Sequence, residues 1–266
     1  MQGEILNKIY EKINSGQRAA LVILTKNRGS TPGRDGSTMG VFEDGKTLGT
    51  IGGGAIEYDV INRTKEALKS GEDFEFDYNL SQSGELKMAC GGDSKGIVKI
   101  FFPKTNLIIF GAGHVSQKLT RVAVNTGFNV YVTDDREEFS KNEDFIGIRD
   151  YLVGKPGEAV DNLPFSKDDT FIVVCTRGHK MDEEAIEALL YKDYKYLGMI
   201  GSKKKVGTLI NNLKEKGYSK EKINSINMPI GLKIDNGSVE EIAISILAEI
   251  LMIKNDKSGE QLKVNI

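Results

Sequence analysis

The fold of this chain is decided by one stretch, residues 106–119, which reads NLIIFGAGHVSQKL. Four apolar residues lead into a glycine turn, and the turn opens a helical pattern. A continuous apolar run is typical of a strand that is buried on both faces of a parallel sheet. Gly111 permits the tight turn, and Gly113 lets a phosphate approach the backbone at the helix start. The stretch therefore predicts a mononucleotide-binding unit.

The next apolar run supports this prediction. Residues 129–135 read NVYVTDD, a second buried strand that ends in acid. A dinucleotide-binding fold places a carboxylate here for a ribose hydroxyl, which makes Asp134 and Asp135 candidate binding residues. The third glycine position of the motif holds Ser116. A Rossmann-like domain that binds no nicotinamide fits the pattern equally well, so both alternatives stay open.

Composition limits the class of protein. The 266 residues suffice for two domains, and 39% hydrophobic with 28% charged residues is a globular balance. The net charge of −2 gives no basic field for nucleic acid. No secretion signal and no apolar run of about 18 residues is seen, so no membrane association is expected. Two cysteines, Cys90 and Cys175, make no disulfide framework, and a reducing cytoplasm is the expected location.

The first half of the chain, residues 1–103, predicts a smaller α+β domain. An amphipathic helix begins it, and the dipeptide Asp44-Gly45 marks a hairpin turn. Further strands are expected at residues 19–24, 74–80 and 97–102.

Three consecutive glycines, Gly52, Gly53 and Gly54, precede a helix that should end near residue 70. Such a run costs backbone entropy and packs nothing, while it makes N–H groups accessible at the helix start. This favours a ligand over a plain tight connection. Cys90 and Gly91 follow in another glycine-rich loop, where the thiol is either an inert small hydrophobe or a thiolate and soft ligand.

The second half predicts a Rossmann-like domain at residues 106–254, with a doubly wound parallel sheet, and a polar tail at residues 255–266. Its further strands are expected at residues 148–153, 169–175 and 196–200.

Two helix starts in this half differ in charge. Asp182 is expected to cap a helix whose acidic first turn satisfies its own dipole. Residues 201–205 read GSKKK, and lysines at a helix start oppose the dipole unless an external anion lies there. Ser202 and Lys203 are therefore candidate anion-binding residues, with plain solvation of the lysines as the alternative.

The chain has two histidines, His114 and His179, and each directly follows a predicted central strand. Ligands bind at the carboxyl edge of an open α/β sheet, so both side chains are expected in one crevice, as candidate catalytic or binding residues. Cys90 is the third catalytic candidate. No paired-histidine spacing suggests a metal site, and no G-x-S-x-G elbow suggests a hydrolase.

Taken together and in order, the motifs resemble the xanthine dehydrogenase accessory family, XdhC and CoxI. The resemblance covers nearly the whole chain. The motifs are GSTP at 29–32, TIGGGAIE at 50–57, ACGG at 89–92, FGAGHV at 110–115, VTDDR at 132–136, CTRGH at 175–179, GMIGSK at 198–203 and PIGL at 229–232.

The resemblance implies a maturation factor rather than a metabolic dehydrogenase. Members of the family bind the molybdenum cofactor (molybdopterin, sometimes as a dinucleotide) while its terminal sulfur is installed. They then pass it to an apo molybdenum hydroxylase such as xanthine dehydrogenase. The implied partners are that enzyme, a cysteine desulfurase and a second copy of the chain.

Carried over by position, the resemblance assigns residues 52–54 and Cys90 to the region that handles the cofactor. Gly111, Gly113, His114 and Asp134 would form a nucleotide-type pocket. Many members carry a cysteine directly after the glycine run, where this chain has alanine. A sulfur ligand at that point is therefore not expected here.

Two other functions remain as alternatives. An NAD(P)-dependent oxidoreductase would place Asp134 on the ribose and use His114 or His179 as a proton donor. A non-enzymatic assembly scaffold would keep the Rossmann fold after losing its ligand.

Overall fold

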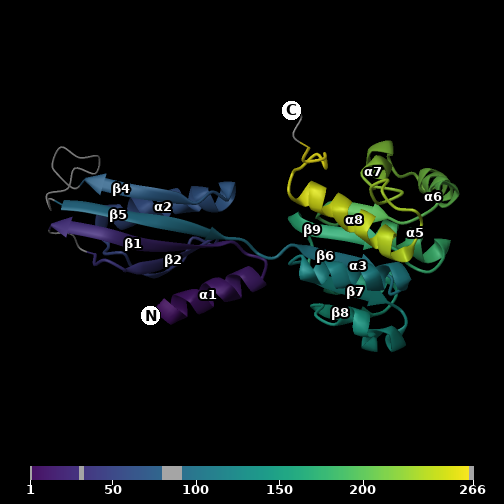
Figure 1. Cartoon of the computed structure of the whole chain (residues 1–266), viewed down its shortest axis with the longest axis horizontal. Helices are drawn as coiled ribbons and strands as arrows, with labels where there is room; N and C mark the ends of the chain where they lie inside the picture. The colour runs from purple at the N-terminus through teal and green to yellow at the C-terminus, as the bar shows by residue number, and fades with distance from the viewer. Residues whose placement is uncertain (1, 30–32, 80–91, 264–266) are drawn as a thin grey trace. The chain divides into compact units, whose positions relative to one another are not determined.

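The computed structural model describes residues 2–29, 33–79 and 92–263. The chain forms two compact units, Met1–Lys104 and Thr105–Ile266 (Figure 1). Each unit has its own sheet and its own hydrophobic core. Cys90 and Gly91 lie outside the described residues.

The first unit contains a five-stranded antiparallel sheet in the order β3-β2-β1-β5-β4. Its elements are α1 (Gln2–Asn14), β1 (Ala19–Gly29), β2 (Thr38–Phe42), β3 (Thr47–Gly49), α2 (Gly54–Ser70), β4 (Phe74–Asn79) and β5 (Gly92–Phe101).

The two helices of this unit cover opposite faces of its sheet. Neighbouring residues of β1 point to opposite sides, so Ala19 packs with Ile5 of α1, whereas Ala20 packs with Val60 of α2. The α2 face forms the larger core. This arrangement is an α+β domain, as the sequence predicts.

The second unit contains a five-stranded parallel sheet in the order β10-β9-β6-β7-β8. Its strands are β6 (Asn106–Phe110), β7 (Asn129–Asp134), β8 (Asp150–Val153), β9 (Ser166–Val174) and β10 (Tyr194–Met199). Its helices are α3 (His114–Asn125), α4 (Pro156–Ala159), α5 (His179–Leu189), α6 (Lys203–Glu215), α7 (Lys220–Asn224) and α8 (Val239–Lys254), with short 3₁₀ turns at Glu137–Lys141, Glu143–Phe145 and Val160–Asn162.

Strand β6 lies at the centre of this sheet and is buried on both faces. Ile108 and Phe110 pack with α5 and α6, while Leu107 and Ile109 pack with α3 and α8. None of these four side chains is exposed. Helices therefore cover both faces of the parallel sheet, which confirms the predicted doubly wound Rossmann-like fold.

The strand order of this sheet reverses beside β6. From β6 the chain moves outward through β7 and β8, then returns to β9 on the other side of β6. The carboxyl ends of β6, β7 and β9 therefore meet at the topological switch point, which is where open α/β sheets bind ligands.

One helix start differs from the sequence prediction. Helix α5 begins at His179 with Gly178 as its cap, so Asp182 lies inside the first turn. Gly178 has a φ of 82°, a left-handed conformation that glycine adopts at little cost. Asp182 is 1% exposed because its carboxylate is used inside the protein, as described below.

None of the helices in the described residues combines the length and apolar character needed to span a bilayer.

Candidate functional site

A cavity of about 270 Å³ lies at the switch point of the parallel sheet. Three segments form it: the start of α3, the loop after β7 and the loop after β9. Its lining residues are Gly113, His114, Arg136, Phe139, Cys175, Thr176 and Arg177.

The two glycines of the β6–α3 turn have different roles. Gly111 has a φ of +110°, and a Cβ on it would lie 2.4 Å from the carbonyl oxygen of Cys175. Its N–H donates to the carbonyl of Thr133 at 2.7 Å. Gly113 has a φ of −72°, and a Cβ there would meet nothing within 4 Å. Gly111 therefore makes the turn possible, while Gly113 keeps the cavity open beside it.

Asp134 is engaged by the protein itself. Its carboxylate accepts hydrogen bonds from the N–H of Ala112 at 2.7 Å and from the N–H of Arg136 at 3.1 Å. It also accepts from Nε and Nη2 of Arg136 at 2.7 and 2.8 Å. Burial raises the pKa of Asp134, but the hydrogen bonds from Arg136 and Ala112 outweigh it and hold the pKa below its ordinary value.

These contacts change the role expected of Asp134. The carboxylate is 5% exposed and each of its oxygens accepts two hydrogen bonds. It does not line the cavity. The structure therefore does not offer Asp134 as the ribose acceptor that the sequence predicts. Its carboxylate instead links the N–H of Ala112, in the glycine turn, to the guanidinium of Arg136.

Two arginines reach the cavity from neighbouring loops. The guanidinium of Arg136 lies over the ring of Phe139, with its carbon 4.2 Å from the ring centroid. Arg177 donates from Nη2 to Asp135 at 2.8 Å, and its side chain is 58% exposed. Each guanidinium is held by a carboxylate that does not line the cavity. A bidentate partner and an aromatic face fix the plane of Arg136 before any ligand binds.

Cys175 and Thr176 also line the cavity. Burial, and then the carboxylate of Asp182, raise the pKa of Cys175 to about 12. The thiol is therefore protonated at neutral pH and is a poor nucleophile. Thr176 donates from its N–H and its hydroxyl to Asp182, at 3.1 and 2.7 Å, so Asp182 fixes the loop that carries both residues.

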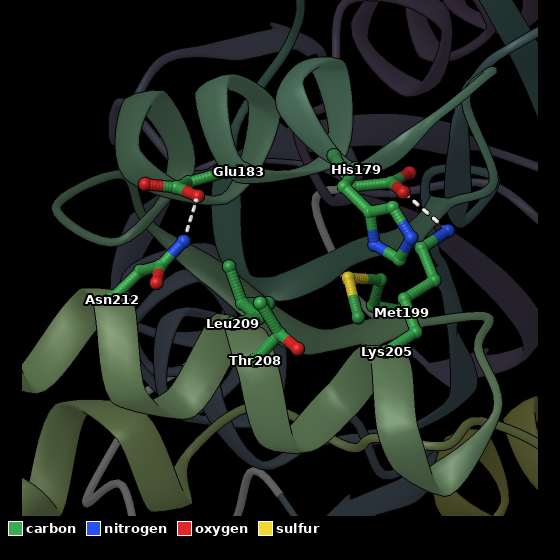
Figure 2. A pocket seen from close by; sticks show the side chains of 8 residues that line it. His179, Glu183, Met199, Lys205, Thr208, Leu209 and Asn212 are labelled. Atoms are coloured by element: carbon green, nitrogen blue, oxygen red, sulfur yellow. Dashed lines mark hydrogen bonds and ion pairs between the residues drawn. The ribbon is translucent and has the colours of Figure 1, made fainter.

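A second, much smaller cavity lies between α5 and α6 (Figure 2). Its volume of about 10 Å³ suffices for roughly one water molecule. His179 and Met199 line it, and the ammonium of Lys205 pairs there with Asp182. His179 also lines an open surface cavity with Glu183 and Lys216.

The two histidines thus line different cavities, His114 that of the switch point and His179 those beside α5. The expectation of one shared crevice is wrong. Both residues follow neighbouring strands, but His179 begins a helix that packs beside α6, and its ring lies toward Met199 and Lys205 (Figure 2).

The lysine-rich start of α6 is partly explained within the chain. Ser202 caps the helix, and its hydroxyl accepts from the N–H of Lys205 at 3.2 Å. The ammonium of Lys205 pairs with Asp182, so an external anion is not needed to account for it. Lys203 is exposed in the first turn. An anion site at Ser202 and Lys203 remains a prediction.

In the first unit, the glycine run binds a carboxylate of its own helix. Glu57 accepts from the N–H of Ile51 at 2.9 Å and of Gly53 at 3.0 Å, and from the hydroxyl of Thr50. Burial raises the pKa of Glu57, but these hydrogen bonds outweigh it and lower the pKa overall. Part of the anion-binding capacity expected of residues 52–54 is thus used by Glu57.

Sequence reasoning gave no separate role to the residues that orient the cavity. Arg136 and Arg177 stand inside the motifs VTDDR and CTRGH, next to residues that were singled out. A basic side chain close to the end of a predicted strand was the one signal. Phe139 carries no such signal, and the lysine run at residues 203–205 does not reveal that Lys205 pairs with Asp182, because these partners are known only once the loops are placed.

Among the described residues, no three His, Cys, Asp or Glu side chains gather to hold a metal ion.

Two of the related proteins are longer than this chain. The chain is 33% identical over 243 residues to the uncharacterized protein YqeB of Escherichia coli, covering 90% of this chain and 44% of that one. It is 31% identical over 152 residues to a probable xanthine dehydrogenase subunit from Bacillus subtilis, covering 57% and 44%. The chain thus spans less than half the length of these two relatives.

A third relative matches over most of both lengths. The molybdenum cofactor insertion chaperone PaoD of Escherichia coli is 22% identical over 303 residues, covering 94% of this chain and 88% of that one. A crystal structure described as a xanthine dehydrogenase from Bacillus halodurans shares the fold, with a TM-score of 0.53, 21% identity and coverage of 97% and 98%.

The family assignment follows from the motifs and from the extent of the match. The family model of the XdhC Rossmann domain matches residues 107–250, and the model of the XdhC and CoxI family matches residues 13–79. The first of these alone spans more than half of the chain and contains the cavity. The chain belongs to the XdhC and CoxI family.

Proposed function

We propose that this protein is an accessory chaperone that binds molybdenum cofactor of the molybdopterin type and inserts it into an apo molybdenum hydroxylase of the xanthine dehydrogenase kind. The proposal also includes support of cofactor sulfuration, with a cysteine desulfurase as partner, and a homodimeric state in the cytoplasm. The observation that carries it is the switch-point cavity in a chain of this family, similar over most of its length to a molybdenum cofactor insertion chaperone.

The chemistry of the cavity suits a cargo site. Two guanidiniums and an imidazole offer donors to a phosphate and to the polar edge of a ring. The thiol of Cys175 is protonated and the cavity has no base paired with a nucleophile among its described lining residues. A chaperone needs affinity and a route of release rather than such a pair.

The oxidoreductase alternative is supported by the fold, since the parallel sheet binds at its switch point. It is weakened by Asp134, whose oxygens are engaged by Ala112 and Arg136. Binding of NAD(H) and NADP(H) is therefore measured beside binding of the molybdenum cofactor.

The test is a binding titration of the full chain with molybdenum cofactor released from a molybdoenzyme, beside NAD(H) and NADP(H). The variant Gly113→Val adds bulk to a residue that lines the cavity, at a position where a Cβ meets no protein atom within 4 Å. We expect it to lose cofactor binding and to keep its thermal stability. Gly207→Val on α6, another position open to a side chain, is the matched control and should bind as the parent does.

A second readout is the reconstitution of an apo molybdenum hydroxylase by the loaded protein. A folded protein that binds no cofactor, or that binds it without raising the activity of the apo enzyme above free cofactor, contradicts the proposal. Nicotinamide binding without cofactor binding supports the oxidoreductase alternative.

A further inference from the structure

We infer that the switch-point cavity recognises a phosphomonoester on its ligand and discriminates against the same ligand with a free hydroxyl there. The inference rests on the proposed function, because it names the part of the cargo that this cavity holds. It follows from two observations: hydrogen-bond donors line the cavity, and the nearby carboxylates are already paired with arginines.

The groups that line the cavity are predominantly donors. They are the guanidiniums of Arg136 and Arg177, the imidazole of His114 and the backbone at the start of α3. No carboxylate is among the described residues that line it. A sugar diol needs an acceptor such as a carboxylate, whereas a phosphate needs donors and positive charge. The lining therefore matches the phosphate.

The carboxylates that could bind a diol are committed elsewhere. Asp134 accepts four hydrogen bonds from Ala112 and Arg136 and is 5% exposed. One oxygen of Asp135 accepts from Arg177, and its other oxygen is buried, 4.0 Å from Nε of Arg136. A ribose hydroxyl would have to break an ion pair to reach Asp134 or the oxygen of Asp135 that Arg177 holds, and the remaining oxygen of Asp135 is buried away from solvent.

The same ion pairs prepare the arginines for an anion. Asp134 binds Nε and Nη2 of Arg136, and Phe139 covers one face of that guanidinium. Within the part of the chain that the structure describes, this leaves Nη1 for a ligand. Arg177 keeps its other donors beyond the bond from Nη2 to Asp135. Because the side chain of Arg136 is oriented beforehand, it loses little conformational entropy when a phosphate binds.

The charge of the lining also favours a dianion. Arg136 and Arg177 both line the cavity, whereas Asp134 and Asp135, which pair with them and offset part of their charge, do not. A phosphomonoester carries close to two negative charges at neutral pH and offers three acceptor oxygens. A phosphodiester linkage carries one charge, so it should bind less tightly than the terminal phosphate.

The experiment compares two matched pairs of probes on the full chain by calorimetry. The first pair is NADP⁺ and NAD⁺, which differ in one phosphomonoester on a ribose. The second is a phosphorylated pterin derived from the cofactor, before and after treatment with phosphatase. We expect the phosphorylated member of at least one pair to bind at least about tenfold more tightly, since charge-assisted hydrogen bonds are gained. The pair that shows the difference identifies the source of the phosphate.

The variant Arg177→Gln tests whether the arginines cause the difference. Arg177 is 58% exposed, so its replacement should leave the fold intact. We expect the ratio within the pair to fall to near one. Arg121→Gln, an arginine on α3 with a side chain 65% exposed that pairs with Asp144 and does not line the cavity, is the control and should keep the ratio.

Three outcomes overturn the inference: equal affinities within both pairs, no binding of any of the four probes, or a phosphate preference that survives Arg177→Gln and Arg136→Gln alike. The cofactor titration separates this result from the proposed function. Cofactor binding without phosphate discrimination overturns only the inference, whereas phosphate discrimination without cofactor binding overturns the proposed function.

Discussion

The ammonium of Lys205, in the first turn of α6, pairs with the buried carboxylate of Asp182 on α5. The other oxygen of Asp182 holds the N–H and the hydroxyl of Thr176. One carboxylate therefore ties the loop that follows β9 to the helix that follows β10.

Asp182→Asn should be among the most destabilising single changes in the second unit. It leaves Lys205, only 18% exposed, without its counter-charge, and breaking one partner of a buried ion pair costs about 3–5 kcal/mol of unfolding free energy. Urea unfolding followed by circular dichroism measures the loss. Lys205→Met should cost a similar amount, because it leaves the more deeply buried carboxylate of Asp182 without its counter-charge. Lys204→Met, at the exposed neighbouring position, is the control and should leave the midpoint unchanged.

The glycines of the β6–α3 turn should respond in opposite ways to one added methyl group. Gly111→Ala places a Cβ against the carbonyl of Cys175 in a left-handed backbone conformation, so we expect a loss of more than about 2 kcal/mol in unfolding free energy. Gly113→Ala meets open space at a φ of −72° and should stay within about 0.5 kcal/mol of the parent. Thermal unfolding of both variants decides this, and equal losses would contradict the assigned roles.

Glu57 should make the first unit sensitive to acid. Its pKa is lowered in the folded state, so its stabilising effect is present above the unfolded pKa and is lost as pH falls through the folded pKa. We expect Glu57→Gln to cost about 1–3 kcal/mol at pH 7, since three hydrogen bonds to a charged group are weakened. The gap between parent and variant should narrow as pH falls below the ordinary glutamate pKa of about 4.3 and close as it passes through the lower folded pKa.

The control for this change is Glu66→Gln, on the exposed side of the same helix, which should leave stability unaltered at either pH. A gap between parent and Glu57→Gln that does not narrow as pH falls would show that packing of the side chain, rather than its charge, holds the glycine run.

Cys175 should be unreactive in the folded protein. In a Cys90→Ser background it is the one remaining cysteine. With its pKa raised to about 12, iodoacetamide at pH 8 should label it at least about a hundredfold more slowly than an ordinary thiol of pKa near 8.5. The same sample in urea should label at the ordinary rate. Rapid labelling of the folded protein would show that the thiol is ionised at this site.

The sequence predicted the central strand and its glycine turn because both are local. Residues 106–119 contain the apolar run, the turn and the helix start together. It could not predict the commitment of Asp134, since the conformation that lets Arg136 turn back on its neighbour depends on Phe139 and on the glycine turn. The pairing of Asp182 with Lys205 was equally hidden, because it requires the adjacency of β9 and β10.

The cap at Asp182 was mispredicted for the same reason. An acidic residue at the start of a helical pattern is an ordinary capping signal. Here the helix starts earlier, at His179, because Gly178 adopts a left-handed conformation that a sequence pattern does not specify.

The strand order has a consequence for the timing of assembly. The walls of the switch-point cavity come from segments that follow β6, β7 and β9, and β9, which pairs with β6, follows it about 60 residues later in the chain. A nascent or partly folded chain therefore has no cavity to load. Ligand affinity in this unit therefore depends on a complete sheet, and a bound ligand in turn makes every opening that separates β9 from β6 less favourable.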